Sequence, residues 1–390
     1  MGNSETKQKN TGISASQYGD ILIKTDKSYY FSGEIVQGNI YLNVIKEGFP
    51  GCVIYLCVLG KEKCQWTETS TSTSTDSEGN TSESTTTYTY KGKSYIYSHK
   101  LELHNFQSPF LPLGQFVFPF QFQLFSHLPG SFYEKDLAKI CYKVKASVNS
   151  KKPSYNSIIS IQRLIIREPI RQITNNLTGA MLVHSEDCCC QSDEACRIKC
   201  KIDKNNYLPG DVVYLEINID NLHLDVQLYS ISIHLINILT LTDDSGRQNR
   251  QSSIVAKKEI QGVPPRSNEI KNVQFILRNN NSPLEIQPSA NGHLVNSAYS
   301  LLIKANIETD SCCCKEDPSI QIPIQIVAIQ PQNNDPFLDQ PPDWNPQIFQ
   351  IQKFYLTDSN KQKKNIVHSD QYNAQYKNNS IQHMQQQMQD

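Results

Sequence analysis

The sequence predicts an all-β protein in which two β-sandwich domains stand in tandem and a disordered tail follows them. The first observation is a repeat: within the stretch 21–44, residues 24–40 align without a gap with residues 201–217, at an offset of 177 positions (203 − 26 = 177). Self-similarity at the length of a domain indicates two copies of one domain. The second observation is that apolar residues alternate in many short runs, and no stretch has a long helical period. This pattern is typical of β-sandwiches.

The repeat has the same local plan in both copies. An alternating run leads into a turn centred on Ser32-Gly33 or on Pro209-Gly210, and a second alternating run follows. Glu34 of the first copy is answered by Asp211 of the second. The identical pairs are Lys24 and Lys201, Asp26 and Asp203, Lys27 and Lys204, Tyr30 and Tyr207, Gly33 and Gly210, and Val36 and Val213. The plan predicts a strand, a glycine-bearing turn and a second strand at the start of each domain.

Further strands are predicted wherever apolar residues alternate or run together over strand length. Phe116 to Leu124 places a row of apolar side chains on one face and predicts a core strand. Pro119 cannot donate a hydrogen bond to a neighbouring strand, which predicts that this strand lies at a sheet edge or is bulged there. The other predicted strands are 52–59, 140–148, 158–166, 229–241, 270–277, 298–307 and 320–329.

These elements divide the chain into five parts. We predict a flexible N-terminal arm (1–17), a first β-sandwich (18–170), a linker (171–194), a second β-sandwich (195–330) and a disordered Gln/Asn-rich tail (331–390). Within the first domain, the segment from Thr67 to Thr87 is almost wholly Ser, Thr, Glu, Asp and Gly. Because such a composition buries little apolar surface, the segment is predicted to be a long solvated loop.

Length and charge limit the classes of function. A chain of 390 residues with 38% hydrophobic content is long enough to fill two cores. The formal net charge is −1, and no local run of Lys and Arg stands out. Proteins that bind nucleic acid through phosphate contacts usually have a basic excess or a basic stripe. No nucleic-acid partner is therefore predicted.

The sequence also predicts a soluble, cytoplasmic protein, and association with the plasma membrane or endosome is the open alternative if the chain carries a lipid. The first ten residues contain no apolar segment of a signal peptide, and the longest apolar run, Cys52 to Leu59, is far shorter than the ~20 residues of a membrane span. In the cytoplasm the twelve Cys are expected to be reduced rather than joined in disulfides. The chain contains no G-x-S-x-G, no H-E-x-x-H and no phosphate-binding Gly loop, so we predict that it is not an enzyme.

Three motifs in the same order resemble the arrestin family. The repeated stretch looks like the opening of the arrestin domain in its N-terminal and C-terminal forms, with the full pattern at 207–211 and Ser32 where the family usually has Pro. Segments 118–122, 128–132 and 142–146 are similar to the middle of the N-terminal domain of α-arrestins. The resemblance covers about residues 18–330 and implies two immunoglobulin-like, arrestin-type sandwiches.

The resemblance implies an adaptor that binds the tails of membrane-protein cargo and links them to trafficking, endocytic or coat machinery. The Pro-Pro-x-Tyr motif of many α-arrestins is absent, because Pro265 is followed by Arg266-Ser267 and Pro342 by Asp343-Trp344. Direct recruitment of a WW-domain ubiquitin ligase is therefore not implied. Two alternatives stay open: a metal- or thiol-dependent sensor on an arrestin scaffold, and a structural subunit of a coat resembling the arrestin-like retromer component.

The cysteines after residue 185 form a candidate metal site. If the first and last strands of the second sandwich run side by side, two remote cysteine triplets meet at one end of it. Clustered thiolates suit a closed tetrahedral Zn²⁺ site. S-acylation of exposed triplets and redox sensing are the competing interpretations. The candidate ligands are Cys188, Cys189, Cys190, Cys196, Cys312, Cys313 and Cys314.

Two short motifs indicate membrane and partner contacts. Met1 to Thr6 fits the N-myristoylation pattern, which requires Gly2, and one acyl chain gives only marginal membrane binding, so a second signal is needed. Asp335-Pro336-Phe337 is similar to the motif that clathrin-adaptor appendage domains recognise. The alternative for this region is that its apolar residues fold back onto the second sandwich and cover a strand edge. These residues are Phe337, Leu338, Trp344 and Phe349.

The acylation of Gly2 is tested by fractionating cells that express the intact chain. We expect part of the wild-type protein in the membrane fraction and a shift of the Gly2→Ala variant to the soluble fraction, because the amide-linked chain forms only on an N-terminal Gly. An unmodified N-terminal peptide in the mass spectrum of the wild-type protein would exclude the lipid.

The zinc interpretation is tested by metal analysis of the purified, reduced protein. Four thiolates in a closed site predict about one Zn²⁺ per chain and a loss of stability after chelation. A metal-free protein whose thermal stability does not change with chelator would leave acylation or simple proximity of the thiols.

Overall fold

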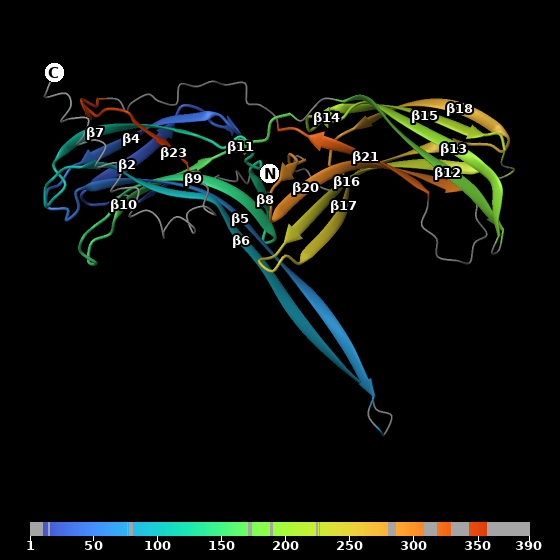
Figure 1. The fold of residues 1–390 in the computed structure, drawn as a ribbon, viewed down its shortest axis with the longest axis horizontal. Coiled ribbons are helices and arrows are strands. Elements are labelled where there is room, and N and C mark those ends of the chain that lie inside the picture. The colour runs from blue at the N-terminus through green and yellow to red at the C-terminus, as the bar shows by residue number, and fades with distance from the viewer. Residues whose placement is uncertain are drawn as a thin grey trace, which may run out of the picture.

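A computed structural model describes residues 11–14, 16–75, 77, 81–170, 174–187, 190–223, 225, 227–279, 286–307, 318–328 and 343–356. Over these residues the regular structure is entirely β-strand. Figure 1 shows two β-sandwiches placed end to end, with a long two-stranded ribbon that leaves the molecule between them. The prediction of two tandem β-sandwiches is therefore confirmed. Across the same described residues, no helix is long and apolar enough to cross a membrane.

The first sandwich is built from two facing sheets. One sheet has the order β1 (Thr11–Ser14), β10 (Ile158–Leu164), β9 (Ala138–Val148), β5 (Val53–Thr75) and β6 (Thr81–Asn105), and β8 (Phe132–Glu134) also pairs with β9. The facing sheet has the order β2 (Gly19–Thr25), β4 (Ile35–Val44) and β7 (Gly114–Gln123). The short strands β3 (Tyr30–Phe31) and β11 (Ile166–Arg167) pair in parallel beside them. Alternate residues of β2 and β9 are buried, as the period of a half-buried strand requires.

The second sandwich repeats this plan. One sheet has the order β12 (Asn175–Asp187), β13 (Cys190–Lys204), β15 (Val212–Asn221) and β18 (Ser267–Ile276). The other has the order β14 (Asn206–Tyr207), β21 (Ser319–Ile326), β20 (Val295–Ile307), β16 (Leu228–Thr242) and β17 (Gln248–Val263), and β19 (Ala290–Asn291) pairs with β20. The inward faces of both sheets form a core rich in Ile.

The Ser/Thr-rich segment is not the predicted loop. Strands β5 and β6 continue past the sandwich and pair residue by residue from Thr67 opposite Thr89 to Thr75 opposite Thr81 (Figure 1). The hydroxyl oxygens of Ser74 and Ser82 lie 2.7 Å apart across the ribbon. Threonine has a high β-propensity, and the ribbon extends a register already fixed by the core. The prediction considered only side-chain burial and therefore missed the backbone pairing.

The predicted linker 171–194 is also wrong in large part. Its residues from Asn175 form β12, which pairs antiparallel with β13 and becomes an edge strand of the second sandwich. A Cβ atom at Gly179 would lie 2.2 Å from a methyl carbon of Ile320, so glycine lets β12 pack closely on the facing sheet. The irregular spacing of apolar residues in this segment concealed a strand that is buried on only one side.

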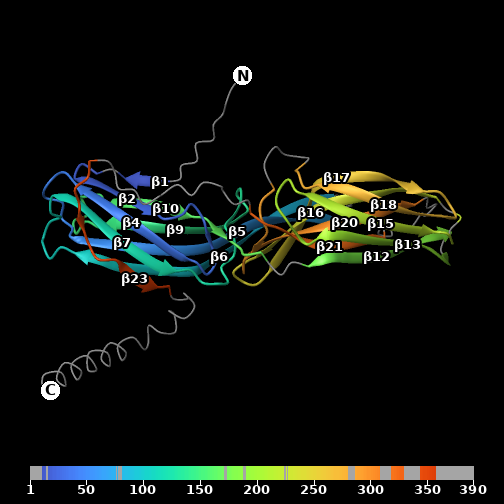
Figure 2. The same cartoon turned by 90° about the horizontal axis from the view of Figure 1, so that it is seen from above.

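Part of the predicted disordered tail folds back onto the first sandwich. Strand β22 (Gln347–Ile348) pairs in parallel with Phe116 and Val117, and β23 (Gln352–Tyr355) pairs in parallel with Phe120 to Gln123 (Figure 2). The tail therefore covers the edge of the first sandwich, rather than that of the second sandwich as the alternative interpretation had it. Strand β7 is the last strand of the sandwich's own sheet, but the tail strands pair with it, so it is not an edge of the complete sheet. The tail pairing is interrupted opposite Pro119, which has no N–H to donate.

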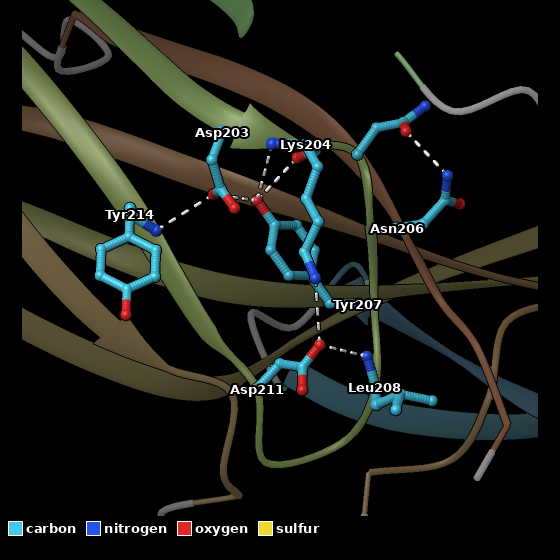
Figure 3. Close-up of polar contacts among 8 residues, drawn as sticks. Asp203, Lys204, Asn206, Tyr207, Leu208, Asp211 and Tyr214 are labelled. Carbon is cyan, nitrogen blue, oxygen red and sulfur yellow. Dashed lines mark hydrogen bonds and ion pairs between the residues drawn. The ribbon is translucent and has the colours of Figure 1, made fainter. Parts of the chain in front are cut away.

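The repeated residues form the same hydrogen-bond network in both sandwiches. In the second, the Tyr207 hydroxyl donates to Asp203 Oδ1 at 2.7 Å, and the same oxygen accepts the backbone N–H of Tyr214 at 3.1 Å (Figure 3). In the first, Tyr30 donates to Asp26 Oδ1, which also accepts the N–H of Gln37.

The turn that follows is fixed by a second carboxylate. Asp211 accepts the backbone N–H of Leu208 at 3.0 Å and pairs with Lys204 at 3.4 Å (Figure 3). Glu34 makes the equivalent bond to the N–H of Phe31 at 3.0 Å and pairs with Lys27 at 3.2 Å. The repeat is therefore explained by a structural requirement, because it ties strand β2 of the first sandwich and strand β13 of the second to the turns that follow them.

Loss of the buried hydroxyl should destabilise the second sandwich. We expect Tyr207→Phe to lower the free energy of unfolding by about 1–3 kcal/mol, because the buried Tyr207 hydroxyl can no longer donate to Asp203 Oδ1 and to the carbonyl of Lys204. The matched control is Tyr214→Phe, whose ring is 56% exposed and whose effect should stay within about 0.5 kcal/mol. Denaturant titration of both variants measures the difference, and equal effects would show that the network does not stabilise the fold.

Candidate functional site

Two contact regions, rather than a metal cluster, stand out among the described residues. These residues contain no group of three or more His, Cys, Asp or Glu side chains placed to hold a metal ion. A concavity of about 400 Å³ lies open on the outer face of the second sandwich beside Lys201, Tyr214 and Glu216. What the geometry offers are two contact regions, the junction between the sandwiches and the edge that the tail covers.

The junction is organised around the carboxylate of Glu62, on strand β5 of the first sandwich. This side chain is 3% exposed, and all its described hydrogen bonds come from backbone N–H groups of the second sandwich. Oε1 accepts from His293 at 3.1 Å, and Oε2 accepts from Leu294 at 2.7 Å and Val295 at 3.2 Å. A Cβ atom at Gly292 would lie 2.7 Å from Oε2, so only glycine allows this approach. Hydrogen bonds to a charged acceptor are stronger than neutral ones.

The turn between β16 and β17 holds the base of the ribbon. Asp244 accepts the backbone N–H of Lys93 at 2.8 Å and donates its own N–H to the carbonyl of Lys91 at 3.1 Å. Arg247 pairs with Glu68 at 2.5 Å and lies over the ring of Tyr90, 4.4 Å from its centroid. The base of the ribbon is therefore held by both sandwiches: it continues strands β5 and β6 of the first, and it is bonded to the β16–β17 turn of the second.

Apolar packing joins the two sandwiches as well. The hydrophobic core of the first sandwich continues into residues of the second and into the tail. Glu168 of the first sandwich bonds across the junction, accepting the N–H of Asn291 at 2.6 Å. The residues of the second sandwich in this core are Leu239, Leu241, Ala290, Leu294 and Val295. The junction is therefore a packed interface rather than a flexible connection.

Two aromatic side chains of the tail anchor it at the edge of β7, and each of them packs against a histidine of β6. Phe354 is 8% exposed and stacks on His99 at a centroid distance of 5.5 Å. Phe349 packs on His104 at 4.3 Å and on Phe118 at 4.6 Å. Burial lowers the pKa of both imidazoles below the ordinary value of 6.5. The docked tail therefore favours neutral histidines.

The structure places few of the predicted site residues. Cys196 is fully buried in the core of the second sandwich, and burial raises the pKa of its thiol to about 11, which favours a packing role. For Cys190 only the backbone is described, at the β13 end of the β12–β13 hairpin. The zinc site stays a prediction, as do the other short motifs, because their remaining residues lie outside the described residues: Gly2, Cys188, Cys189, Cys312, Cys313, Cys314, Asp335, Pro336 and Phe337.

Sequence reasoning missed Glu62 and Phe354, and its alternative interpretation of the tail named Phe349 but placed it on the second sandwich instead of the first. A signal for Glu62 was present, because it continues the alternation of Val58 and Gly60 on the inward face of β5, where a charged side chain needs a partner. No comparable signal marked the tail, since Phe349 and Phe354 follow no strand period.

Docking of the tail should weaken at acidic pH. A lowered histidine pKa means that the folded state favours the neutral imidazole, so the stabilisation is complete above the ordinary pKa and is lost as the pH falls from 6.5 through the lowered values. We expect backbone hydrogen exchange of residues 343–356, corrected for intrinsic rates, to increase from pH 7.5 to pH 5.5. A His99→Gln, His104→Gln variant should show a flatter pH dependence. The same pH dependence in this variant would contradict the assignment.

Comparison with known proteins identifies the family. The family model described as Arrestin (or S-antigen), N-terminal domain matches residues 19–171, and the model of the C-terminal domain matches residues 192–331. A curated relative, Arrestin domain-containing protein A of Dictyostelium discoideum, is 24% identical in an alignment of 334 residues that covers 82% of this chain and 53% of that protein. The chain thus spans about half the length of this relative. Both matches follow the order and extent of the two sandwiches, and the chain belongs to the arrestin family.

Proposed function

We propose that the protein is a cytoplasmic, non-enzymatic adaptor that binds membrane-protein cargo and links it to trafficking or endocytic machinery. The observation that supports this most strongly is the match of both arrestin domain models over the two sandwiches. The described residues offer extended surfaces and covered sheet edges instead of an enclosed pocket with convergent catalytic groups. These features fit recognition of another macromolecule.

The domain junction supports an adaptor that acts as one rigid platform. A cargo tail that contacts both sandwiches binds more tightly if their relative position is fixed beforehand, because less freedom is lost on binding. Glu62 and the base of the ribbon both provide such a restraint. We infer that cargo is recognised across this platform.

We further propose that Asp335-Pro336-Phe337 recruits a coat adaptor. The segment that contains it connects Ala328 of the second sandwich with Asp343, where the tail begins on the first sandwich. Pro336 restricts the backbone and lowers the ordering cost, while Phe337 offers an aromatic group for a pocket.

Proximity labelling in the native cell tests both parts of this proposal. The wild-type chain should label membrane proteins together with a coat adaptor, and Phe337→Ala should lose the adaptor while it keeps the cargo and its melting temperature. Labelling that contains no membrane protein would refute the adaptor function. A Phe337→Ala variant with all partners retained would refute only the motif.

A matched control is Phe354→Ala in the docked part of the tail. Its aromatic ring is buried against the first sandwich, so this variant should lower the melting temperature by a few degrees. If Phe337→Ala behaves in the same way, with a lowered melting temperature and unchanged partners, residue 337 is part of the fold and does not recruit.

A further inference from the structure

Three loops meet at the end of the first sandwich that faces away from the junction. They are residues 45–52 between β4 and β5, 106–113 between β6 and β7, and 149–157 between β9 and β10. The N–H of Leu111 donates to the carbonyl of Phe49 at 3.1 Å, and the N–H of Lys151 donates to the carbonyl of Pro50 at 2.7 Å. The three loops are therefore held side by side, and we call them the distal loops.

The distal loops expose apolar side chains next to buried ones. Ile45 is 66% exposed, Phe110 is 46% exposed and Leu113 is 48% exposed, whereas Phe49 and Leu111 are almost fully buried. The buried pair anchors the loops to the core, so the exposed side chains project from a supported backbone. Pro109 and Pro112 flank the segment that holds Phe110, and proline fixes the backbone further. An isolated exposed apolar residue needs no explanation, but three on adjoining loops indicate a contact surface.

The charge of the distal loops is positive, although the whole chain is close to neutral. They contain Lys46, Lys151 and Lys152, all exposed, and one acidic residue, Glu47. This gives a formal charge of +2 (3 − 1) at one end of a chain whose net charge is −1. Apolar side chains surrounded by lysines match the boundary of an anionic bilayer, where the apolar groups enter the headgroup region and the lysines stay among the phosphates.

We propose that the distal loops are a contact site for a lipid bilayer with anionic headgroups. Phe110, Leu113 and Ile45 insert at the boundary between headgroups and acyl chains, and Lys151 and Lys152 attract the negative surface. The contact is weak, because three partly exposed side chains and three lysines provide only a modest attraction. It supplies the second membrane signal that a single acyl chain on Gly2 requires, and it does not depend on whether that acyl chain is present. It is also independent of the proposed adaptor function.

The site is tested by co-sedimentation of the full chain with vesicles. The protein is used as Gly2→Ala, so that no N-terminal lipid contributes, and the vesicles consist of phosphatidylcholine alone or with about one third phosphatidylserine. We expect binding to the anionic vesicles and much weaker binding to the neutral ones. Phe110→Ser with Leu113→Ser should reduce the affinity about tenfold, and Lys151→Gln with Lys152→Gln should reduce it about fivefold for each lysine.

The matched control is Ile270→Ser with Ile276→Ser, two exposed apolar residues of β18 in the second sandwich. This variant should sediment like the wild-type chain. Melting temperatures of all variants should be equal, since the substituted side chains are exposed. Absence of wild-type binding to anionic vesicles would overturn the proposal, and so would binding that the distal-loop variants retain in full. If cells instead show a protein captured by the distal loops while vesicles do not bind, the surface is a protein-docking site and the lipid assignment is wrong.

Discussion

The buried carboxylate of Glu62 is the interaction on which the arrangement of the two sandwiches depends. A charged group that is withdrawn from water costs several kcal/mol unless donors replace the water, and the backbone donors of Glu62 belong to the other sandwich. Neither domain can satisfy this charge alone. Gly292 lets the backbone come close enough, and the apolar residues around it exclude water. The same interface positions the turn that holds the base of the ribbon, so the junction determines where the ribbon leaves the molecule.

The repeated residues show why the fold could be predicted from the sequence. Asp26 with Tyr30, and Asp203 with Tyr207, form local bonds between residues four positions apart. Because these bonds are local, the Asp and the Tyr recur at a fixed spacing in the sequence. The two copies of this pair indicate two domains. The alternating core strands could be predicted for the same reason, since the polarity of each residue indicates whether its side chain is buried. Pro119 likewise predicted an edge strand, and β7 is the last strand of the sandwich's own sheet, although the tail then covers it.

The parts that could not be predicted depend on partners far away in the chain. Strand β23 pairs with residues more than two hundred positions earlier, and the apolar spacing of Phe349 and Phe354 acquires meaning only beside the edge of β7. The ribbon differs, because its stability comes from backbone pairing that continues a register set by the core, and composition alone does not report this. Among the candidate site residues, Cys196 shows the limit of motif reasoning, because a cysteine grouped with possible ligands in sequence occupies the core.

The molecule combines three parts: two sandwiches held in a fixed arrangement, a sheet edge that its own tail covers, and distal loops that expose both apolar side chains and lysines. The central claim is that Glu62 couples the two sandwiches, and calorimetric unfolding of Glu62→Gln tests it most directly. The substitution keeps the shape but replaces one oxygen with an amide group that faces N–H donors. We predict that the junction is weakened by about 1.5–3 kcal/mol, and that the unfolding temperature falls and the single transition separates into two. An unfolding profile identical to that of the wild-type chain would contradict the coupling.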